Sequence, residues 1–552
     1  MQKTDRPYAS LGKTMAQRVS AGFAALALLG LSHLAVAQEI PAIPIPQQPF
    51  AQPVPRFIGQ PAMPKPITAL PVPEDPFMAP NGRSNIHVDA YQSDTYATAG
   101  PLGLAPTVKS AVLGGLGGTV TFDSAGRIVI FVFGINGTRR LFLLDPVTLG
   151  TEAFLNLPPL SSSGTAFGGG GYYFLDELDR AVIPTTTQQI WIVQVQASRP
   201  YLEHVNTCDL PQLIGQQISG QSIQSVFPDA QGLLWFTTSG IVDKQSPTWA
   251  ATSPALVGTL VFEGTNQCTV KTLTLAPSTT PTPTTPTENE SISKSFAVDP
   301  VPAAKGQGGV FIVSDYAMYR FDAAPDGTPQ ITWREAYDRG TPPPKLGQIQ
   351  VGSGTTPTLM GTDFVTIADN ANPIDVLVYR RAAQVQGSRL VCKVPVFEEN
   401  ASATENSLIA TNQSIVVENN YGYYGPQATL FNRATTPGIT RIDLNADQSG
   451  CNTVWTNNQE SIPSVVSQMS LANGLIYTYT KDPDSCSTPG PCYTAAWYLT
   501  AIDFASGQTV FKRLGGTGLF YNNHYSAVYL GPDQKTAYVG VIGGLIAIRD
   551  RY

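Results

Sequence analysis

The chain has 552 residues, a formal net charge of −7, and only 13% charged residues. A chain this acidic lacks the basic surface that nucleic acid or an anionic membrane requires, so neither is expected as a partner. The 50 glycines and 46 prolines indicate a chain rich in turns and poor in helix.

Residues 1–37 have the organisation of a cleaved signal peptide. Basic residues precede the apolar run 21–37, which ends in Ala35-Val36-Ala37, the small-residue pattern at which signal peptidase cuts. The run is short for a membrane span of about 20 residues, and no later stretch is long and apolar enough to be one. We therefore expect an exported protein, periplasmic or extracellular, with no transmembrane span once the signal is removed.

Residues 38–85 are rich in proline, as in PAIPIPQQPFAQPVPRF. Proline removes backbone donors and favours an extended, solvated conformation, so this segment is predicted to be a disordered arm. The folded domain is then expected to cover residues 86–552.

From residue 86 onward the chain repeats a pattern of short β-branched or alternating runs separated by polar turns. The clearest units are two strands joined by a tight turn built on aspartate: Val120–Phe133 with Asp123, Val226–Thr237 with Asp229, and Tyr529–Val541 with Asp533. Eight such groups recur about every 58 residues, which suits four-stranded blades. They begin near residues 118, 170, 223, 294, 357, 407, 466 and 526.

This period predicts an all-β fold, a β-propeller of eight blades. A seven-bladed ring with an insertion near residues 277–290 is the alternative, and paired β-sandwich domains would not produce the period. The last group is short, so an N-terminal strand from about residues 88–100 is expected to complete it and close the ring.

The cysteines follow the same period. Cys208 and Cys268 are about one repeat apart, as are Cys392 and Cys451, which predicts disulfides between equivalent outer strands of neighbouring blades. A third disulfide, between Cys486 and Cys492, would close a small loop.

One segment resembles the repeat of pyrroloquinoline-quinone dehydrogenases. Ala501-Ile502-Asp503-Phe504-Ala505-Ser506-Gly507 matches their A-x-D-x-x-T-G turn with serine in place of threonine, and LFLLDPVTLG is a weaker copy. The resemblance implies an eight-bladed quinoprotein-like fold. Phe511 stands where that family has a docking tryptophan, and the family's adjacent cysteine pair is missing, so bound quinone is not expected.

Two other segments resemble the SMP-30/gluconolactonase and NHL-type propellers. Val365–Arg380 is similar to their Y-V-A-D-x-x-N-x-x-V unit, and Gly309–Phe321 is a looser copy. The lactonases hold a Ca²⁺ or similar ion on the axis with Glu, Asn and Asp side chains, and the resemblance implies such an ion here. Those propellers usually have six blades, so the resemblance covers single blades.

The candidate site residues follow the second strands of three consecutive blades and one connection between blades. Carboxylate and amide oxygens at equivalent positions suit Ca²⁺, although Asp and Asn are also ordinary turn residues. Glu418 stands out because it directly follows the apolar run 414–417. The predicted metal ligands are Asp369, Glu418, Asn419 and Asn523; the predicted ligand-binding residues are Asp315, Asn370, Asn420, Tyr421 and Tyr423; the candidate general base is His524.

These features favour an exported binding or scaffolding propeller of the cell envelope, with an axial Ca²⁺ as a further expectation. Its partner would be a small molecule or an envelope protein. Two alternatives remain: a metal-dependent hydrolase or lactonase, and a quinone-dependent dehydrogenase-like protein.

Overall fold

A computed structural model describes residues 39–48, 54–160, 169–196, 200–302, 308–429, 434–482 and 495–552. The predicted signal peptide, residues 1–37, and the predicted Cys486–Cys492 bridge lie outside these ranges. Within them, no helix is both long and apolar enough to cross a lipid bilayer.

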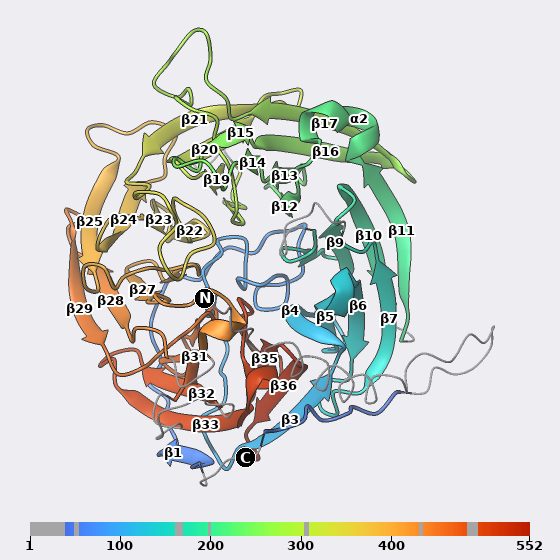
Figure 1. The fold of residues 1–552 in the computed structure, drawn as a ribbon, viewed down its shortest axis with the longest axis vertical. Helices are drawn as coiled ribbons and strands as arrows, with labels where there is room; N and C mark the ends of the chain where they lie inside the picture. The colour runs from blue at the N-terminus through green and yellow to red at the C-terminus, as the bar shows by residue number, and fades with distance from the viewer. Residues whose placement is uncertain are drawn as a thin grey trace, which may run out of the picture. The chain divides into compact units, whose positions relative to one another are not determined.

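Residues 39–552 form a ring of eight antiparallel sheets, each with four ring-forming strands, around a central axis (Figure 1). The first strand of each blade lies nearest the axis and the fourth lies at the perimeter. The eight-bladed prediction is confirmed, and the seven-bladed and paired-sandwich alternatives are wrong.

The first four blades follow one another along the chain. Blade 1 is β4 (Gly115–Phe122), β5 (Ile128–Gly134), β6 (Arg139–Leu144) and β7 (Thr151–Leu157); blade 2 is β8 (Phe174–Leu175), β9 (Arg180–Pro184), β10 (Gln189–Val195) and β11 (Leu202–Asp209); blade 3 is β12 (Ile223–Pro228), β13 (Leu234–Thr238), β16 (Leu256–Gly264) and β17 (Gln267–Thr274), with the small hairpin β14 (Ile241–Val242) and β15 (Ala251–Ser253); blade 4 is β18 (Ala297–Val298), β19 (Val310–Val313), β20 (Ala317–Ala323) and β21 (Pro329–Ala336).

The last four blades include three strands from the N-terminal part of the chain. Blade 5 is β22 (Thr358–Met360), β23 (Phe364–Ala368), β24 (Ile374–Arg380) and β25 (Leu390–Val396); blade 6 is β26 (Ile409–Ala410), β27 (Ser414–Glu418), β28 (Ile439–Leu444) and β29 (Cys451–Asn457); blade 7 is β30 (Gln468–Ser470), β31 (Leu475–Lys481), β32 (Ala496–Asp503) and β33 (Thr509–Thr517), flanked by β1 (Phe57–Gly59) and β2 (Thr95–Tyr96); blade 8 is β34 (Val528–Leu530), β35 (Thr536–Val541), β36 (Gly544–Arg549) and β3 (Thr107–Val112). Among the described residues, the helical elements are α2 (Leu210–Ile218), η2 (Ile135–Gly137), η4 (Pro426–Thr429) and η6 (Leu519–Tyr521).

The aspartate turns form as the sequence predicts. In the β4–β5 turn, Asp123 Oδ1 accepts hydrogen bonds from the amides of Ala125 (3.1 Å) and Arg127 (2.8 Å). Asp229 does the same for the β12–β13 turn, accepting from Gln231 at 2.9 Å and Leu233 at 3.1 Å. The side chain replaces the missing backbone partners of the turn, which is why aspartate recurs there.

The ring is closed by an N-terminal strand, but not by residues 88–100. The outer strand of blade 8 is β3, which pairs antiparallel with β36 from Thr107↔Arg549 to Val112↔Gly544. Residues 95–96 instead form β2, which pairs parallel with β30 at the inner edge of blade 7. Residues 90–94 lie on the axis, where their carbonyl oxygens pair with the inner strands of several blades. They are therefore not available at the perimeter, and β3 forms the outer strand of blade 8 instead.

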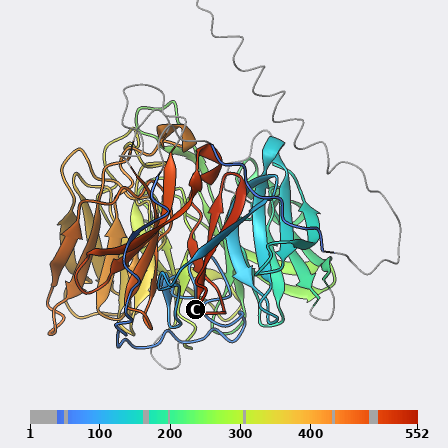
Figure 2. The same cartoon turned by 90° about the horizontal axis from the view of Figure 1, so that it is seen from below.

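The Pro-rich segment lies on the ring rather than in a separate arm. Residues 39–48 and 54–72, here called the strap, cross the C-terminal blades, as the dark-blue chain in Figure 2 shows. Ile40 donates to the carbonyl of Thr151 in blade 1 (2.8 Å), Ile43 accepts from Val112 in blade 8 (2.8 Å), and β1 pairs with β33. Its prolines lack donors, so the strap attaches through short pairings rather than a full strand.

Residues 83–96, here called the plug, lie in the axial channel (Figure 1). Their carbonyl oxygens accept backbone hydrogen bonds from the inner strands of six blades. The pairs are Phe122→Arg83, Leu175→Ser84, Val298→Ala90, Leu359→Tyr91, Ala410→Ser93 and Met469→Asp94, at 2.8–3.1 Å. One short segment thus pairs with donors at the inner edges of most of the blades.

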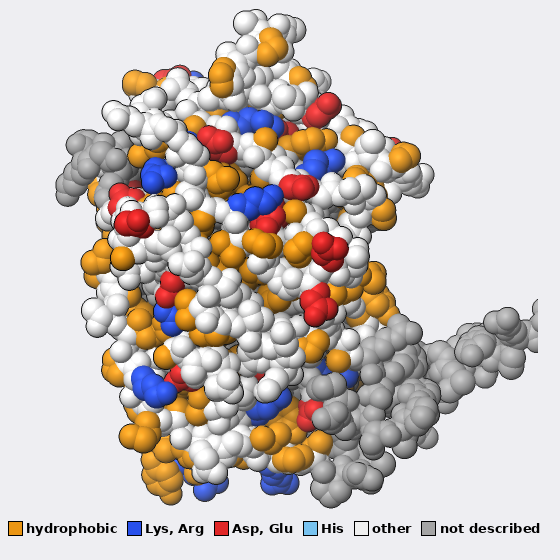
Figure 3. All heavy atoms as spheres, turned by 90° about the vertical axis from the view of Figure 1, so that its left-hand side faces the viewer, with side chains coloured by type: hydrophobic (Ala, Val, Ile, Leu, Met, Phe, Trp, Pro, Cys, Tyr) orange, Lys and Arg blue, Asp and Glu red, His pale blue; other side chains and the backbone are white. Residues whose placement is uncertain are grey.

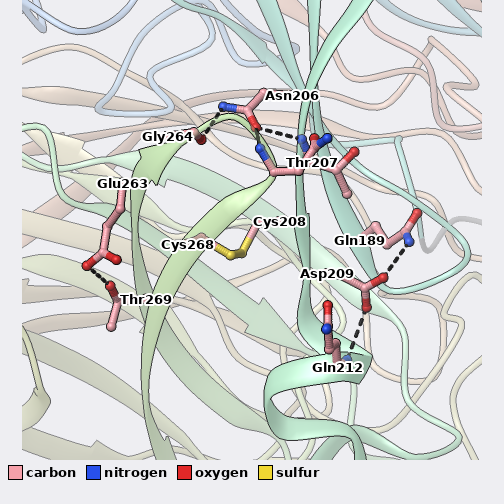
Figure 4. The surroundings of a disulfide bond; sticks show 11 residues. Gln189, Asn206, Thr207, Cys208, Asp209, Gln212, Glu263, Gly264, Cys268 and Thr269 are labelled. Carbon is pink, nitrogen blue, oxygen red and sulfur yellow. Dashed lines mark hydrogen bonds between the residues drawn. A yellow bond between two sulfur atoms is a disulfide. The ribbon is translucent and has the colours of Figure 1, made fainter.

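The two predicted inter-blade disulfides are confirmed. Cys208–Cys268 joins β11 of blade 2 to β17 of blade 3, and Cys392–Cys451 joins β25 of blade 5 to β29 of blade 6. Near the first bridge, the side chain of Asn206 donates to the carbonyl of Gly264 (3.2 Å; Figure 4). The same side chain accepts from the amide of Asn266 (2.6 Å). The covalent links and these polar contacts join neighbouring blades at their outer edges.

The outer face around β25 and β29 carries charges of both signs. Figure 3 shows Lys and Arg side chains interspersed with Asp and Glu, and the part drawn in colour has no large area of one charge.

Removing the blade 5–blade 6 bridge tests its contribution to stability. We expect the Cys392→Ala/Cys451→Ala variant to lose roughly 2–5 kcal/mol of unfolding free energy, because the unfolded chain regains the entropy of a long loop. Urea unfolding of both proteins measures the difference. Equal midpoints for the two proteins would contradict the prediction.

Ring closure can be tested at Ala111, which lies buried in β3 against the blade 8 core. We expect Ala111→Asp to cost at least about 3 kcal/mol, since it places an unpaired carboxylate among apolar side chains. The matched control is Ala125→Asp in the exposed β4–β5 turn, for which thermal melts should show a change near zero. A similar loss in both variants would argue against closure by β3.

Candidate binding site on the propeller axis

A small cavity lies on the axis beside the plug, where the segments leading into the innermost strands converge. Its volume is about 60 Å³, enough for a few water molecules or one small polar group. Seven of the eight blades contribute to its wall. Ile86 and His87 of the plug also line it, and Tyr172, His524 and Tyr525 are partly exposed residues of the lining.

A buried ion pair is the main charged feature of this cavity. The ammonium of Lys294, three residues before β18, contacts Glu405 Oε1, four residues before β26. The two side chains are 6% and 1% exposed. Burial raises the pKa of Glu405, and the nearby Lys294 opposes that shift. The amide of Glu405 donates to Asn420 Oδ1 (2.9 Å), which helps to hold the carboxylate in place.

The second oxygen of this carboxylate, Glu405 Oε2, is buried and forms no hydrogen bond of good geometry with a described residue, although the nearby backbone amide of Ile349 lowers the pKa of Glu405. A buried carboxylate oxygen without a donor is costly. Its most direct relief is a donor within the cavity, so this oxygen marks the place where a bound molecule would be recognised.

The plug brings a histidine into the same wall. His87 Nδ1 lies 3.0 Å from Asp94 Oδ1 and 2.9 Å from the hydroxyl of Ser407. The side chain of Gln468 also donates to Asp94 Oδ1, at 2.8 Å. A hydrolytic triad uses different ring nitrogens for serine and aspartate, whereas here both share Nδ1. These contacts therefore fix the orientation of the imidazole ring. Its Nε2 lies 3.5 Å from the hydroxyl of Thr356.

Glu418 and Asn420, predicted as ligands, lie behind the cavity wall. Both carboxylate oxygens of Glu418 accept hydrogen bonds, one from Asn406 Nδ2 and one from the hydroxyl of Ser467. Asn420 donates to the carbonyl of Ile462 (3.1 Å). Burial raises the pKa of Glu418 to about 7. These residues support Asn406, which itself lines the cavity.

Tyr423, Asn523 and His524 form a second predicted group that the structure brings together. The hydroxyl of Tyr423 lies 2.9 Å from His524 Nδ1 and donates to the carbonyl of Asn523 (3.2 Å). Burial lowers the pKa of His524 to about 4, so the imidazole is neutral near pH 7. A base of this pKa is a weak proton acceptor for a reaction at neutral pH.

Three further predicted residues, Asp315, Asp369 and Asn370, form hydrogen bonds with backbone groups of the loops around them. Asp369 Oδ1 accepts from the amides of Ala371 (3.0 Å) and Asp375 (2.8 Å). Asp315 accepts from the amide of Ser291 (2.6 Å), and Asn370 donates to the carbonyl of Arg339 (3.1 Å). Burial raises the pKa of Asp369 to about 7 and that of Asp315 to about 6.

The four predicted metal ligands share no common centre among the described contacts. Asn419 Oδ1 accepts from the amides of Ala403 and Tyr421, the latter at 3.1 Å, and Asn523 donates to the carbonyls of Ser526 and Gly540. In the described part of the chain, no three His, Cys, Asp or Glu residues are placed to hold a metal. Axial Ca²⁺ stays a prediction that these residues, as arranged, do not fit.

The residues that build the cavity were missed by the sequence analysis. His87 lay at the expected domain boundary, and Lys294, Glu405 and Ser407 precede short inner strands rather than follow long ones. A signal was present, because a lysine and a glutamate stand just before the apolar segments SFAV and SLIA. Charges beside buried strands are unusual unless they are paired.

The chain shares limited similarity with known proteins. No protein-family model matches it. An uncharacterized protein from Archaeoglobus fulgidus is 27% identical over 284 residues, covering 46% of this chain and 51% of that protein, so the match spans about half of the relative's length.

Three solved structures show a distant similarity to the chain. BamB from Moraxella catarrhalis has a TM-score of 0.40 and 11% identity, covering 83% of this chain and 96% of that one. The WD40 domain of SCAP from fission yeast has a TM-score of 0.39 and 10% identity, covering 80% and 94%. A putative 6-phosphogluconolactonase from Bacteroides uniformis has a TM-score of 0.33 and 10% identity, covering 63% and 84%. The chain is an eight-bladed β-propeller; the quinoprotein and SMP-30 resemblances remain resemblances of single blades.

Asp89 in the plug gives a testable pH dependence. Burial raises the pKa of Asp89 to about 7, with Asp94 and Glu74 adding to the shift and Ser93 opposing it. The folded protein thus keeps this proton to higher pH than the unfolded chain does. The free energy of unfolding should therefore fall as pH rises from about 4 to about 7.

We expect Asp89→Asn to reduce that fall by on the order of 3 kcal/mol. Urea unfolding across this pH range measures it, with the exposed Asp363→Asn as control. If the wild type and Asp89→Asn gave parallel curves, Asp89 would not be the titrating group.

Proposed function

We propose that this chain is an exported binding β-propeller whose axial cavity takes a small polar molecule. The observation that carries the proposal is the buried Lys294–Glu405 pair, in which Glu405 Oε2 forms no hydrogen bond of good geometry with a described residue. An apolar wall would be at least as stable as a buried ion pair. Retaining the charges is therefore better explained by recognition than by stability.

The contacts define what such a molecule would offer. It would donate an N–H or O–H to Glu405 Oε2 and accept from the ammonium of Lys294. The hydroxyl of Ser407 and His87 lie in the same wall. A cavity of about 60 Å³ suits a small zwitterion or polyol, or one polar end of a larger molecule whose remainder lies outside.

Export is supported by the disulfides and by the N-terminal sequence. Two bridges between outer strands suit an oxidising compartment. The basic and apolar segments of residues 1–37 have the order of a signal peptide. We place the protein in the periplasm or outside the cell.

The two enzymatic alternatives have less support. The lactonase hypothesis needs converging oxygen ligands, but the predicted ones bond to separate protein groups: Asp369 to amides of its own turn, and Glu418 to Asn406 and Ser467. The quinone hypothesis rests on single-blade resemblances in which Phe511 replaces the family's docking tryptophan. Phe511 is buried and stacks on Phe57 of the strap with ring centroids 5.7 Å apart.

The proposal is tested by titrating the mature protein with panels of amino acids and small polyols in a thermal-shift assay followed by calorimetry. A specific ligand at 100 times its dissociation constant should stabilise the fold by about 2.7 kcal/mol. Glu405→Gln should weaken its binding at least about tenfold, since the carboxylate loses charge-assisted bonds.

The matched control is Glu460→Gln, which alters another buried ion pair, with Lys512 at 2.7 Å, outside the cavity lining. It should leave binding unchanged. Binding that is equally strong in Glu405→Gln, or a panel without any specific ligand, would count against an axial recognition site for molecules of this kind.

A further inference from the structure

A second and larger cavity lies under the strap. Its volume is about 500 Å³, within the range of sites for small organic ligands. The strap forms one side, and blades 7 and 8 form the other. The residues that define it are Ile45 and Arg56 of the strap, Lys109 and Ser110 of β3, Arg513 of β33, and Tyr521 of η6.

The lining is basic although the chain is acidic. Arg56, Lys109 and Arg513 line the cavity, and none of the described lining residues is Asp or Glu. Within the described part of the chain, none of these three side chains forms an ion pair. Lys109 donates to the carbonyl of Val147 (2.9 Å) and helps to lower the pKa of the nearby Asp145, so its charge is partly offset. In a chain with a net charge of −7, a cavity lined by three cations is not expected from composition.

Arg513 is held in place while part of its guanidinium stays free. Its Nε donates to the carbonyl of Pro106 (3.1 Å), and Nη1 donates to the carbonyl of Arg56 (2.8 Å). Nη2 has no partner among the described residues. Burial, and then the nearby Arg56 cation, lower the pKa of Arg513. Two cations therefore lie close together without a carboxylate to offset their repulsion.

The cavity is preformed by contacts that fasten the strap. Ser110 Oγ accepts from the amide of Ile45 (3.0 Å), and the hydroxyl of Tyr521 donates to the carbonyl of Ile45 (2.8 Å). Val108 and Leu514 add apolar surface to the wall. The site thus combines cationic donors with an apolar wall and needs no large rearrangement to accept a ligand.

We propose that the strap cavity binds a small molecule that carries an oxyanion, phosphate or carboxylate, on an apolar body. The oxyanion lies between Arg56, Lys109 and the free edge of Arg513, because a guanidinium pairs with the planar edge of a carboxylate or phosphate. The apolar body lies against Val108, Ile45 and Leu514. This site is separate from the axial cavity and does not depend on it.

The test is isothermal calorimetry of the mature protein with phenyl phosphate and with benzoate at fixed ionic strength. We expect one saturable site that weakens as salt is raised. The Arg56→Gln/Lys109→Gln variant changes two exposed residues and should fold normally. It should lower the affinity about tenfold or more.

The control is Lys244→Gln/Lys271→Gln, which removes the same charge from exposed residues of blade 3. It should leave the affinity unchanged, as should Glu405→Gln in the axial cavity. Tighter binding of phenyl phosphate would identify a phosphate ligand, and tighter binding of benzoate a carboxylate. If neither probe binds saturably, or the Arg56→Gln/Lys109→Gln variant binds them as well as the wild type, the proposal is overturned.

Discussion

The backbone hydrogen bonds between the plug and the inner strands are the interaction on which the rest of the structure depends. Each blade presents an inner edge to the channel, and unpaired amides buried there would be costly. Carbonyl oxygens of residues 83–96 pair with amides of six blades. Once the plug is in place, the residues after it lie beside blade 8 and supply β3. The residues before it lie on the outside of the ring as the strap.

The interior is therefore divided into two physical environments. Between blades, side chains such as Ile130, Trp235 and Val539 are fully buried and apolar, and provide the hydrophobic stabilisation. Along the axis, buried polar and charged side chains are joined by hydrogen bonds, and burial raises the pKa values of Asp89 and Glu418. A polar axis stabilises less than an apolar one would. It provides, in return, a wall of donors and acceptors that can distinguish one small molecule from another.

Both cavities exist because the N-terminal segment returns to the ring. The axial cavity takes His87 from the plug, and the strap cavity takes Ile45 and Arg56 from the strap. Their electrostatics differ: the axial site pairs a lysine with a glutamate, whereas the strap site is lined by three cations and, among its described lining residues, by no Asp or Glu. A ligand under the strap would bridge the strap to blades 7 and 8. Its binding would stabilise the same contacts that secure ring closure.

The sequence alone determined the features that depend on local or periodic patterns. Eight strand groups, the aspartate turns and both inter-blade disulfides could be predicted because each follows from spacing within or between repeats. The closing strand, the path of the Pro-rich segment and the axial site were decided by the tertiary structure. Residues 83–96 show no periodicity, and their partners lie up to hundreds of residues away, as for His87 and Ser407. Only folding of the ring brings these side chains to one axis, so no spacing rule could have revealed them.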